Sequence, residues 1–385
     1  MAPPLGRTSR MILLIGNYPL DRQQSMQRFA TMMLAGLTAA GVPAELIQPQ
    51  ARFGRVRILG PFVAKWLAYI DKFIFFPRRL RKELAMHPDL VHICDHSNAM
   101  YAAKIHGRPV VVTCHDLLAV RGALGEDTDC PASATGKILQ RWIVAGLRKA
   151  DVIVTDSQAT LEDVKRLVGE GNGRPKLKKV TLGLSYPYRK LPPGEAWKRL
   201  SESSPLDPQL PFVLHVGSNV AYKNRPGVLR IFAACREQFN RSLVFAGEPL
   251  SDSLRSLGRD LGIADRIVEL PGVSNELLEA LYNCADVLLF PSSAEGFGWP
   301  IAEAHACGCP VLCADREPMR EVAGGAALTH PVKDETGFAA DLLRLTNPEE
   351  RARWSAKALE NAKRFSTERM VTQYIELYRS LGAAA

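Results

Sequence analysis

Nine short runs rich in Val, Ile and Leu recur along the chain, and most of them lead into a glycine or a polar residue. The runs are mostly apolar throughout rather than alternating, which is typical of strands that are buried on both faces of a sheet. Helical patterns separate them, and strands that alternate with helices form parallel sheets of the doubly wound kind. The predicted strands cover residues 11–16, 90–94, 109–115, 151–156, 212–217, 243–247, 267–270, 286–290 and 310–313.

The pattern occurs twice, and each set opens with a strand that leads into a glycine turn, MILLIGN at Met11 and FVLHVGSN at Phe212. Between the sets, residues 189–205 are rich in Pro and Ser and are typical of an interdomain linker. We therefore predict an α/β protein with two Rossmann-like domains, 1–188 and 206–365. Ligands are expected at the carboxyl ends of both sheets, in a cleft between the domains.

An amphipathic helix is expected in the last segment, 366–385. Ser366 is a favourable N-cap residue, and the apolar residues after it follow helical spacing. These apolar residues are Met370, Val371, Tyr374, Ile375 and Leu377. A helix with one apolar stripe needs a surface on which to bury it.

Positive charge is concentrated in the first half of the chain. Residues 1–180 carry 26 Lys and Arg against 15 Asp and Glu, whereas the rest carries 23 against 25. The densest stretch, Arg52 to Lys82, interleaves nine basic residues with seven aromatic ones, and Asp71 is its only acid. Such a stretch fits a solvated helix face, an anionic membrane surface or a nucleic-acid surface. No nucleic-acid-binding motif accompanies it, so we expect no nucleic-acid partner.

The sequence also limits the cellular context. The apolar run at Met11–Ile15 is too short for a signal peptide, and charged residues interrupt the run from Ile58 to Phe76. The eight cysteines form no C-x-x-C pair, which indicates reduced thiols. We expect a cytoplasmic protein, with peripheral contact at the inner face of a membrane as the alternative that the basic stretch leaves open.

The most specific motif is the 21-residue string PSSAEGFGWPIAEAHACGCPV at 291–311. A predicted strand ends at Phe290, immediately before it. Pro300 stands where a helix can begin, because its fixed φ and missing N–H suit the first helical position. The string therefore predicts a strand, a glycine-containing loop and a helix in succession.

This loop offers a cradle for an anion or a hydroxyl group. Backbone N–H groups are expected to be free at Gly296, Phe297 and Gly298. Glu295 in the loop and Glu303 in the first helical turn can accept hydrogen bonds from hydroxyls that approach the cradle. Either glutamate alone is also explained by the helix dipole, but the complete string is much more specific.

The string resembles the signature of glycosyltransferase family 4. Three further segments resemble the same family: VGSNVAYKN at 216–224, LPGV at 270–273 and TCHD at 113–116. The resemblance covers most of the chain and implies the GT-B fold, with a closing helix that packs back on the N-terminal domain. It also implies a nucleotide-sugar donor, retention of anomeric configuration, and no bound metal or other cofactor.

The resemblance assigns a donor site to the second domain. Glu303 would accept the ribose hydroxyls and Glu295 the sugar hydroxyls. Backbone groups of 296–298 would lie beside the sugar and the diphosphate. The Gly217 turn would approach the donor, and the loop at Val273 would recognise the base.

It also assigns the residues nearest the reaction. Lys223 would neutralise the β-phosphate, where negative charge develops as the glycosidic bond breaks. His115 and Asp116 would lie near the sugar from the other domain. With Glu295, these residues are the predicted catalytic set.

This chain departs from the family pattern beside the phosphates. Many members have Arg just after the glycine or just before the Lys-Asn pair, whereas this chain has Ser218 and Tyr222. Arg225 is the nearest replacement. The predicted donor-binding set therefore includes Ser218, Asn224 and Arg225.

The first loop, from Gly16, lacks the paired glycines that are common there. Contact with the acceptor or a phosphate would fall to Asn17, Arg22 or Ser25. His96, after the strand at 90–94, is a further candidate for the acceptor.

One other cluster resembles a metal site: His305, Cys307, Cys309 and Cys313. Its spacing is unlike that of zinc sites, and a helix, turn and strand would spread the side chains apart. We interpret these cysteines as buried thiols.

Together these features predict a retaining hexosyltransferase that uses a GDP- or UDP-linked donor. The acceptor is a hydroxyl of a glycan, a lipid-linked intermediate or a small molecule, as in polysaccharide biosynthesis. Two alternatives remain: a sugar-nucleotide epimerase or hydrolase on the same fold, and a non-catalytic carbohydrate- or lipid-binding protein. The intact glutamate string argues against the first, and the presence of Lys223 and Glu303 argues against the second.

Overall fold

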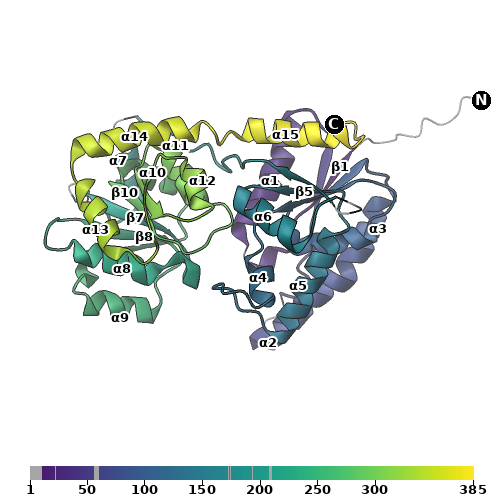
Figure 1. The fold of residues 1–385 in the computed structure, drawn as a ribbon, viewed down its shortest axis with the longest axis horizontal. Coiled ribbons are helices and arrows are strands. Elements are labelled where there is room, and N and C mark those ends of the chain that lie inside the picture. The colour runs from purple at the N-terminus through teal and green to yellow at the C-terminus, as the bar shows by residue number, and fades with distance from the viewer. Residues whose placement is uncertain are drawn as a thin grey trace, which may run out of the picture. The chain divides into compact units, whose positions relative to one another are not determined.

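The computed structural model describes residues 11–21, 23–55, 60–171, 173, 175–192, 194–207 and 210–385. The chain forms two compact units (Figure 1). Unit 1 runs to Ser185 and resumes from Ser366 to Ala385, and unit 2 is Tyr186–Phe365. Each unit contains one six-stranded sheet.

The sheet of unit 1 has the strand order β2-β1-β3-β4-β5-β6, and every neighbouring pair is parallel. Its strands are β1 (Ile12–Ile15), β2 (Ala44–Ile47), β3 (Leu90–Ile93), β4 (Val110–Cys114), β5 (Val152–Thr155) and β6 (Lys176–Lys179). Its α-helices are α1 (Gln24–Ala39), α2 (Gly60–Ile70), α3 (Phe76–Leu84), α4 (Leu118–Ala123), α5 (Ala134–Leu147), α6 (Gln158–Leu167) and α15 (Thr367–Ser380). Shorter helical segments are η1 (Pro19–Asp21), the π-helix η2 (Asp71–Phe75) and η3 (His96–Lys104).

The sheet of unit 2 has the order β12-β11-β10-β7-β8-β9, again with parallel neighbours throughout. Its strands are β7 (Phe212–Gly217), β8 (Ser242–Gly247), β9 (Ile267–Pro271), β10 (Val287–Phe290), β11 (Val311–Ala314) and β12 (Leu328–His330). Its α-helices are α7 (Glu195–Ser203), α8 (Arg225–Ala234), α9 (Asp252–Asp260), α10 (Asn275–Cys284), α11 (Trp299–Ala306), α12 (Met319–Ala323), α13 (Glu335–Arg344) and α14 (Pro348–Ala362). Two short 3-10 segments are η4 (Ala221–Lys223) and η5 (Ala264–Arg266). The predicted doubly wound α/β class is confirmed, because all nine predicted strands lie in these two parallel sheets.

The predicted linker is wrong in one respect, because residues 189–205 contain helix α7. Ala196 and Leu200 are buried, and they share one helix face since they are four residues apart. The side chain of Arg199 donates to Glu279 on α10 at 2.8 Å. The Pro and Ser residues that suggested a linker flank this helix, which belongs to unit 2.

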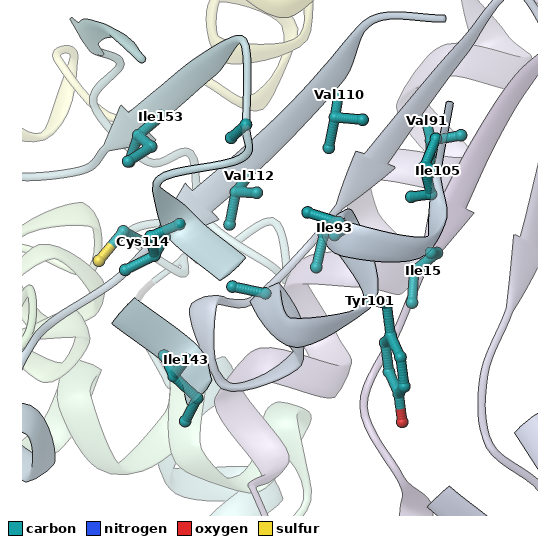
Figure 2. Packing of buried hydrophobic residues seen from close by; sticks show 14 of the residues in the cluster. Ile15, Val91, Ile93, Tyr101, Ile105, Val110, Val112, Cys114, Ile143 and Ile153 are labelled. Atoms are coloured by element: carbon teal, nitrogen blue, oxygen red, sulfur yellow. The ribbon is translucent and has the colours of Figure 1, made fainter. Parts of the chain in front are cut away.

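The core of unit 1 is built from the continuously apolar strands. Figure 2 shows Val91, Ile93, Val110, Val112 and Ile153 from three neighbouring strands, with Tyr101 of η3 and Ile143 of α5 packed among them. Burial on both faces of the sheet explains why these strands do not alternate with polar residues.

Helix α15 completes unit 1 through buried hydroxyl groups. The Tyr378 hydroxyl lies 2.7 Å from Nδ1 of His92, and the Tyr374 hydroxyl lies 2.8 Å from Oγ1 of Thr113. Nε2 of His92 lies 2.8 Å from the same threonine oxygen. The predicted N-cap is confirmed, because Oγ of Ser366 accepts a hydrogen bond from the first turn of α15.

Candidate functional site

Two loops meet at the carboxyl edge of the sheet in unit 2. They follow the neighbouring strands β7 and β10, and both contain predicted donor-binding residues. The backbone N–H of Ser293 donates to the carbonyl of Tyr222 at 2.7 Å, and Nδ2 of Asn224 donates to the carbonyl of Pro291 at 3.1 Å. The fold therefore brings together motifs that are about 70 residues apart in the sequence.

Lys223 and Glu295 form an ion pair where these loops meet. The lysine Nζ donates to Oε1 of Glu295 at 2.7 Å, and the two side chains are only 13% and 9% exposed. Nζ also lies 4.8 Å from the ring centroid of Phe290, within cation–π distance. Two predicted catalytic groups thus stand in contact, one cationic and one able to accept hydrogen bonds from hydroxyls.

The loop before α11 ends in a glycine of left-handed conformation. Gly298 is its N-cap residue with φ of +99°, a left-handed conformation that favours glycine. Pro300 lies in the first turn, as predicted, and the helix begins at Trp299. The side chain of Phe297 is buried against Phe365.

Glu303 lies in the second turn of α11 rather than in the first, because the helix starts one residue before Pro300. The residue is 3% exposed, and its Oε2 accepts a hydrogen bond from the Tyr282 hydroxyl at 2.9 Å. Burial, and then the charge of Glu303, raise the pKa of Tyr282, so its hydroxyl remains a donor. Sequence reasoning missed Tyr282, because a tyrosine on the buried face of α10 carries no motif.

Arg225, predicted beside the phosphates, is bonded to the glycine turn after β7. It is 2% exposed, and its guanidinium donates to the carbonyls of Gly217 and Glu248 and to Oδ1 of Asn219. These bonds fix the backbone of the glycine turn after β7. Arg225 is therefore placed to position the turn, and these bonds use three of the five N–H donors of its guanidinium.

Asn224 likewise has a local structural role. It adopts φ of +49° as the N-cap of α8, and its Oδ1 accepts from the N–H of Gly227. This is the capping arrangement that Asn favours at helix starts. With its bond to the β10 loop, the residue fixes the backbone next to Lys223.

The remaining predicted donor residues lie at the same sheet edge. A Cβ at Gly217 would stand 3.3 Å from Cδ of Lys223, so the glycine lets the lysine pass close to the backbone. Ser218 follows it and is half-buried, as is Val273 in the loop after β9. Because β9, β8, β7 and β10 are adjacent parallel strands, all these loops emerge at one edge.

In unit 1, the predicted acceptor residue Asn17 belongs to a buried polar cluster. Asn17 is 1% exposed, donates to the side chains of Asp95 and Gln23, and accepts from Asn98. Its amide is thus occupied by side chains at the carboxyl end of β3. Arg22 lies outside the described residues, and Ser25 is exposed in the first turn of α1.

His115 is held at both ring nitrogens. Nδ1 lies 3.0 Å from Oδ2 of Asp156, and Nε2 lies 3.0 Å from the carbonyl oxygen of Cys94. A carbonyl cannot donate, so Nε2 must carry the proton. Burial lowers the pKa of His115, but the hydrogen bond and charge of Asp156 outweigh burial and raise it. Sequence reasoning identified His115 and missed Asp156, which ends a different strand.

The neighbouring polar residues differ in exposure. Asp116 is half-buried, and its Oδ1 accepts from the N–H of Leu118 at 3.0 Å at the start of α4. His96 is 8% exposed, with Nδ1 3.0 Å from Oδ1 of Asp95. Burial opposes the charge of this ring, but Asp95 raises the pKa of His96 to about 9. His96 is therefore an imidazolium near neutral pH.

Within the described ranges, no group of three or more His, Cys, Asp and Glu side chains is arranged to hold a metal ion. Nδ1 of His305 lies 2.9 Å from the side-chain amide of Asn361, inside unit 2. Cys307, Cys309 and Cys313 are buried free thiols, as interpreted from their spacing.

Comparison with known proteins gives matches along most of the chain. The family model described as "Glycosyl transferases group 1" matches residues 198–361, and "Glycosyltransferase Family 4" matches residues 26–175. The D-inositol 3-phosphate glycosyltransferase of Saccharomonospora viridis is 31% identical over 296 residues. The matched segment spans 72% of this chain and 66% of that relative's length.

Solved structures share the fold at low sequence identity. Sucrose-phosphate synthase from Thermosynechococcus elongatus has a TM-score of 0.77 at 19% identity, over 98% of this chain and 100% of that one. HepE from Anabaena, solved with UDP and glucose, has a TM-score of 0.72 at 19% identity, over 97% of this chain and 100% of that one. The chain has the GT-B fold and belongs to glycosyltransferase family 4.

Proposed function

We propose that this chain transfers a hexose from a GDP- or UDP-linked donor to a hydroxyl acceptor, with retention and without a bound metal. The observation that carries the proposal is the Lys223–Glu295 pair beside the backbone cradle of Gly296 to Gly298. The likeness to HepE, which was solved with UDP and glucose, supports a nucleotide-sugar donor. A glycan or lipid-linked intermediate of polysaccharide biosynthesis is the acceptor class that we propose.

The ion pair suggests how donor binding begins. A diphosphate carries more negative charge than one carboxylate, so the β-phosphate can replace Glu295 as the partner of Lys223. Glu295 then becomes available to accept hydrogen bonds from the sugar hydroxyls. Lys223 and the N–H groups near α11 stabilise the charge that develops on the leaving diphosphate, a kind of contribution worth about 3 to 4 kcal/mol per donor in other enzymes.

Glu303 is proposed to bind the ribose hydroxyls, with Tyr282 fixing its orientation. His115 and Asp116 are proposed to act near the sugar, and Asn17, Ser25 and His96 near the acceptor. Front-face attack, in which the departing phosphate accepts the acceptor's proton, follows from the family resemblance. The alternative of an epimerase or hydrolase differs in its products and is tested with the same assay.

The experiment supplies labelled GDP- and UDP-hexoses in EDTA, with candidate glycan and lipid-linked acceptors, and analyses the products. Lys223→Ala should lower turnover by about a hundredfold while the fold survives, because the lysine acts on charge formed in the transition state. Lys198→Ala, an exposed lysine on α7, is the matched control and should retain activity. Turnover that survives in Lys223→Ala would contradict the assignment, and release of free or epimerised sugar alone would favour the alternative.

We further propose that the chain works in the cytoplasm and associates peripherally with the inner face of the membrane. Among the described residues, no helix is long and apolar enough to cross a bilayer. The basic, aromatic-rich stretch from Arg52 to Lys82 supports a contact with anionic lipid.

A further inference from the structure

We infer that helices α2 and α5 of unit 1 together form a surface that docks on an anionic phospholipid bilayer. The inference deepens the membrane association proposed above, and it does not depend on the transfer chemistry. It adds α5, which lies far from the basic stretch in the sequence but meets it where Phe73 of η2 contacts Trp142 of α5. The proposed surface contains four aromatic side chains, Trp66, Tyr69, Phe73 and Trp142, together with Ile138. We call these five side chains the aromatic surface.

Ring contacts link the two helices within this surface. Trp66 contacts Tyr69 with ring centroids 5.6 Å apart, and Tyr69 contacts Phe73 at 5.5 Å. Phe73 in turn contacts Trp142 of α5 at 6.1 Å. The aromatic side chains therefore form one connected group across α2, η2 and α5.

The group is unusually exposed for its chemistry. Trp66 is 48% exposed, Ile138 is 54% exposed and Trp142 is 55% exposed. Trp66 and Trp142 are the only tryptophans in the sequence of unit 1, and both are exposed. Exposed apolar side chains that gather in one place mark an interaction site more often than scattered ones do.

The charged side chains of α2 and α5 all have one sign. Lys65 of α2 and Lys137 and Arg141 of α5 are exposed beside its members, and the sequence of α5 contains no acid. Asp71 is buried, where it accepts from the Tyr18 hydroxyl and from backbone N–H groups of residues 52–54. The π-helical turn η2 thus directs this carboxylate inward, while its Lys72 pairs with Asp21 at 2.8 Å, so the cationic side chains of the surface are those of α2 and α5.

A second cluster of exposed rings and cations lies at the end of η2. The rings of Phe53 and Phe75 stack with centroids 5.3 Å apart, and both residues are exposed. The guanidinium groups of Arg52 and Arg78 lie about 6 Å from the Phe75 ring centroid. Aromatic rings interleaved with cations match the interface of an anionic bilayer, where the rings enter the headgroup region and the cations meet phosphates.

The test measures binding of the full chain to vesicles of phosphatidylcholine with and without phosphatidylglycerol, at low and high salt. Binding should require the anionic lipid and weaken as salt rises, because salt shortens the screening length. Lys137→Gln with Arg141→Gln should lower binding roughly tenfold or more, since each cation contributes about 1 kcal/mol near such a surface. Lys176→Gln with Lys179→Gln on β6 removes the same charge from another exposed site of unit 1 and should have much less effect.

Brominated lipid provides a second measurement. It should quench the fluorescence of the full chain, and the quenching should fall in both Trp66→Phe and Trp142→Phe. Equal losses from the α5 and β6 charge pairs, or unchanged quenching in Trp142→Phe, would overturn the role of α5. Thermal stabilisation by a nucleoside diphosphate, measured on every variant, reports the donor site separately. A variant that loses lipid binding but keeps this stabilisation tests the docking surface alone and leaves the transfer proposal unaffected.

Discussion

At the residue scale, the proposed donor site combines groups that a motif marks with groups that only packing reveals. Glu295, Glu303 and Lys223 were identified from the sequence because they stand at fixed positions in a recognisable string. Tyr282 was missed, although its hydroxyl bonds Glu303 at 2.9 Å. Side chains that orient a binding group come from other elements, and their spacing along the chain carries no signal.

Tyr282→Phe tests whether this contact matters. Without the hydroxyl, Glu303 loses a donor to its charged form, and nucleoside diphosphate affinity should fall roughly tenfold. Calorimetry with the nucleotide that binds the wild type measures the change. Tyr374→Phe, the same substitution in unit 1, should leave affinity intact, and equal affinities for all three proteins would remove Tyr282 from the site.

His96 predicts a pH dependence of stability. Its folded pKa of about 9 lies above the ordinary value of 6.5, because the charge of Asp95 outweighs burial. A raised pKa stabilises the fold below about pH 6.5, and this contribution disappears as the pH rises toward 9. Chemical unfolding between pH 6 and 9.5 should show a loss on the order of 1 to 3 kcal/mol that is absent in His96→Gln. Parallel curves for the two proteins would show that this histidine is not charged in the fold.

At the element scale, the sequence predicted every interior strand of the two sheets and one edge strand, β9. The missed strands, β2, β6 and β12, all lie at the edges of their sheets. An edge strand is paired on one side only, so it can be short and polar, as the sequence KLKK of β6 shows. Helix α7 was missed for a related reason, because its flanking prolines and serines masked two apolar residues four positions apart. Interior strands could be predicted because burial on both faces leaves a continuous apolar run.

The packing of α1 against α15 depends on one glycine. A Cβ at Gly36 would lie 2.4 Å from Cγ2 of Val371, and a β-branched side chain cannot turn away easily. Gly36→Ala should therefore cost about 1 to 3 kcal/mol of unfolding free energy despite the better helix propensity of alanine. Val371→Ala should recover part of this loss in the double variant, whereas strictly additive effects would show that the two residues do not meet.

At the scale of the whole molecule, the two units differ in how the chain builds them. Unit 2 is one continuous segment, and unit 1 needs α15 from the end of the chain. Lys223, Glu295, Glu303 and Tyr282 all lie in unit 2. The hydroxyl groups of α15 that bond His92 and Thr113 serve unit 1 alone.

This division predicts that residues 186–365 fold alone and bind a nucleoside diphosphate. The segment has its own six-stranded sheet and a core cluster drawn from that sheet and its helices. A unit of about 180 residues can bury close to 70% of its unfolded surface, which is enough for an independent core. Expressed alone, it should unfold cooperatively and bind with nearly the affinity of the full chain, as calorimetry would measure.

Deleting residues 366–385 should instead destabilise unit 1, because His92 and Thr113 would lose buried partners, while nucleotide binding persists. An isolated segment that folds but binds no nucleotide would show that the donor site needs residues of unit 1.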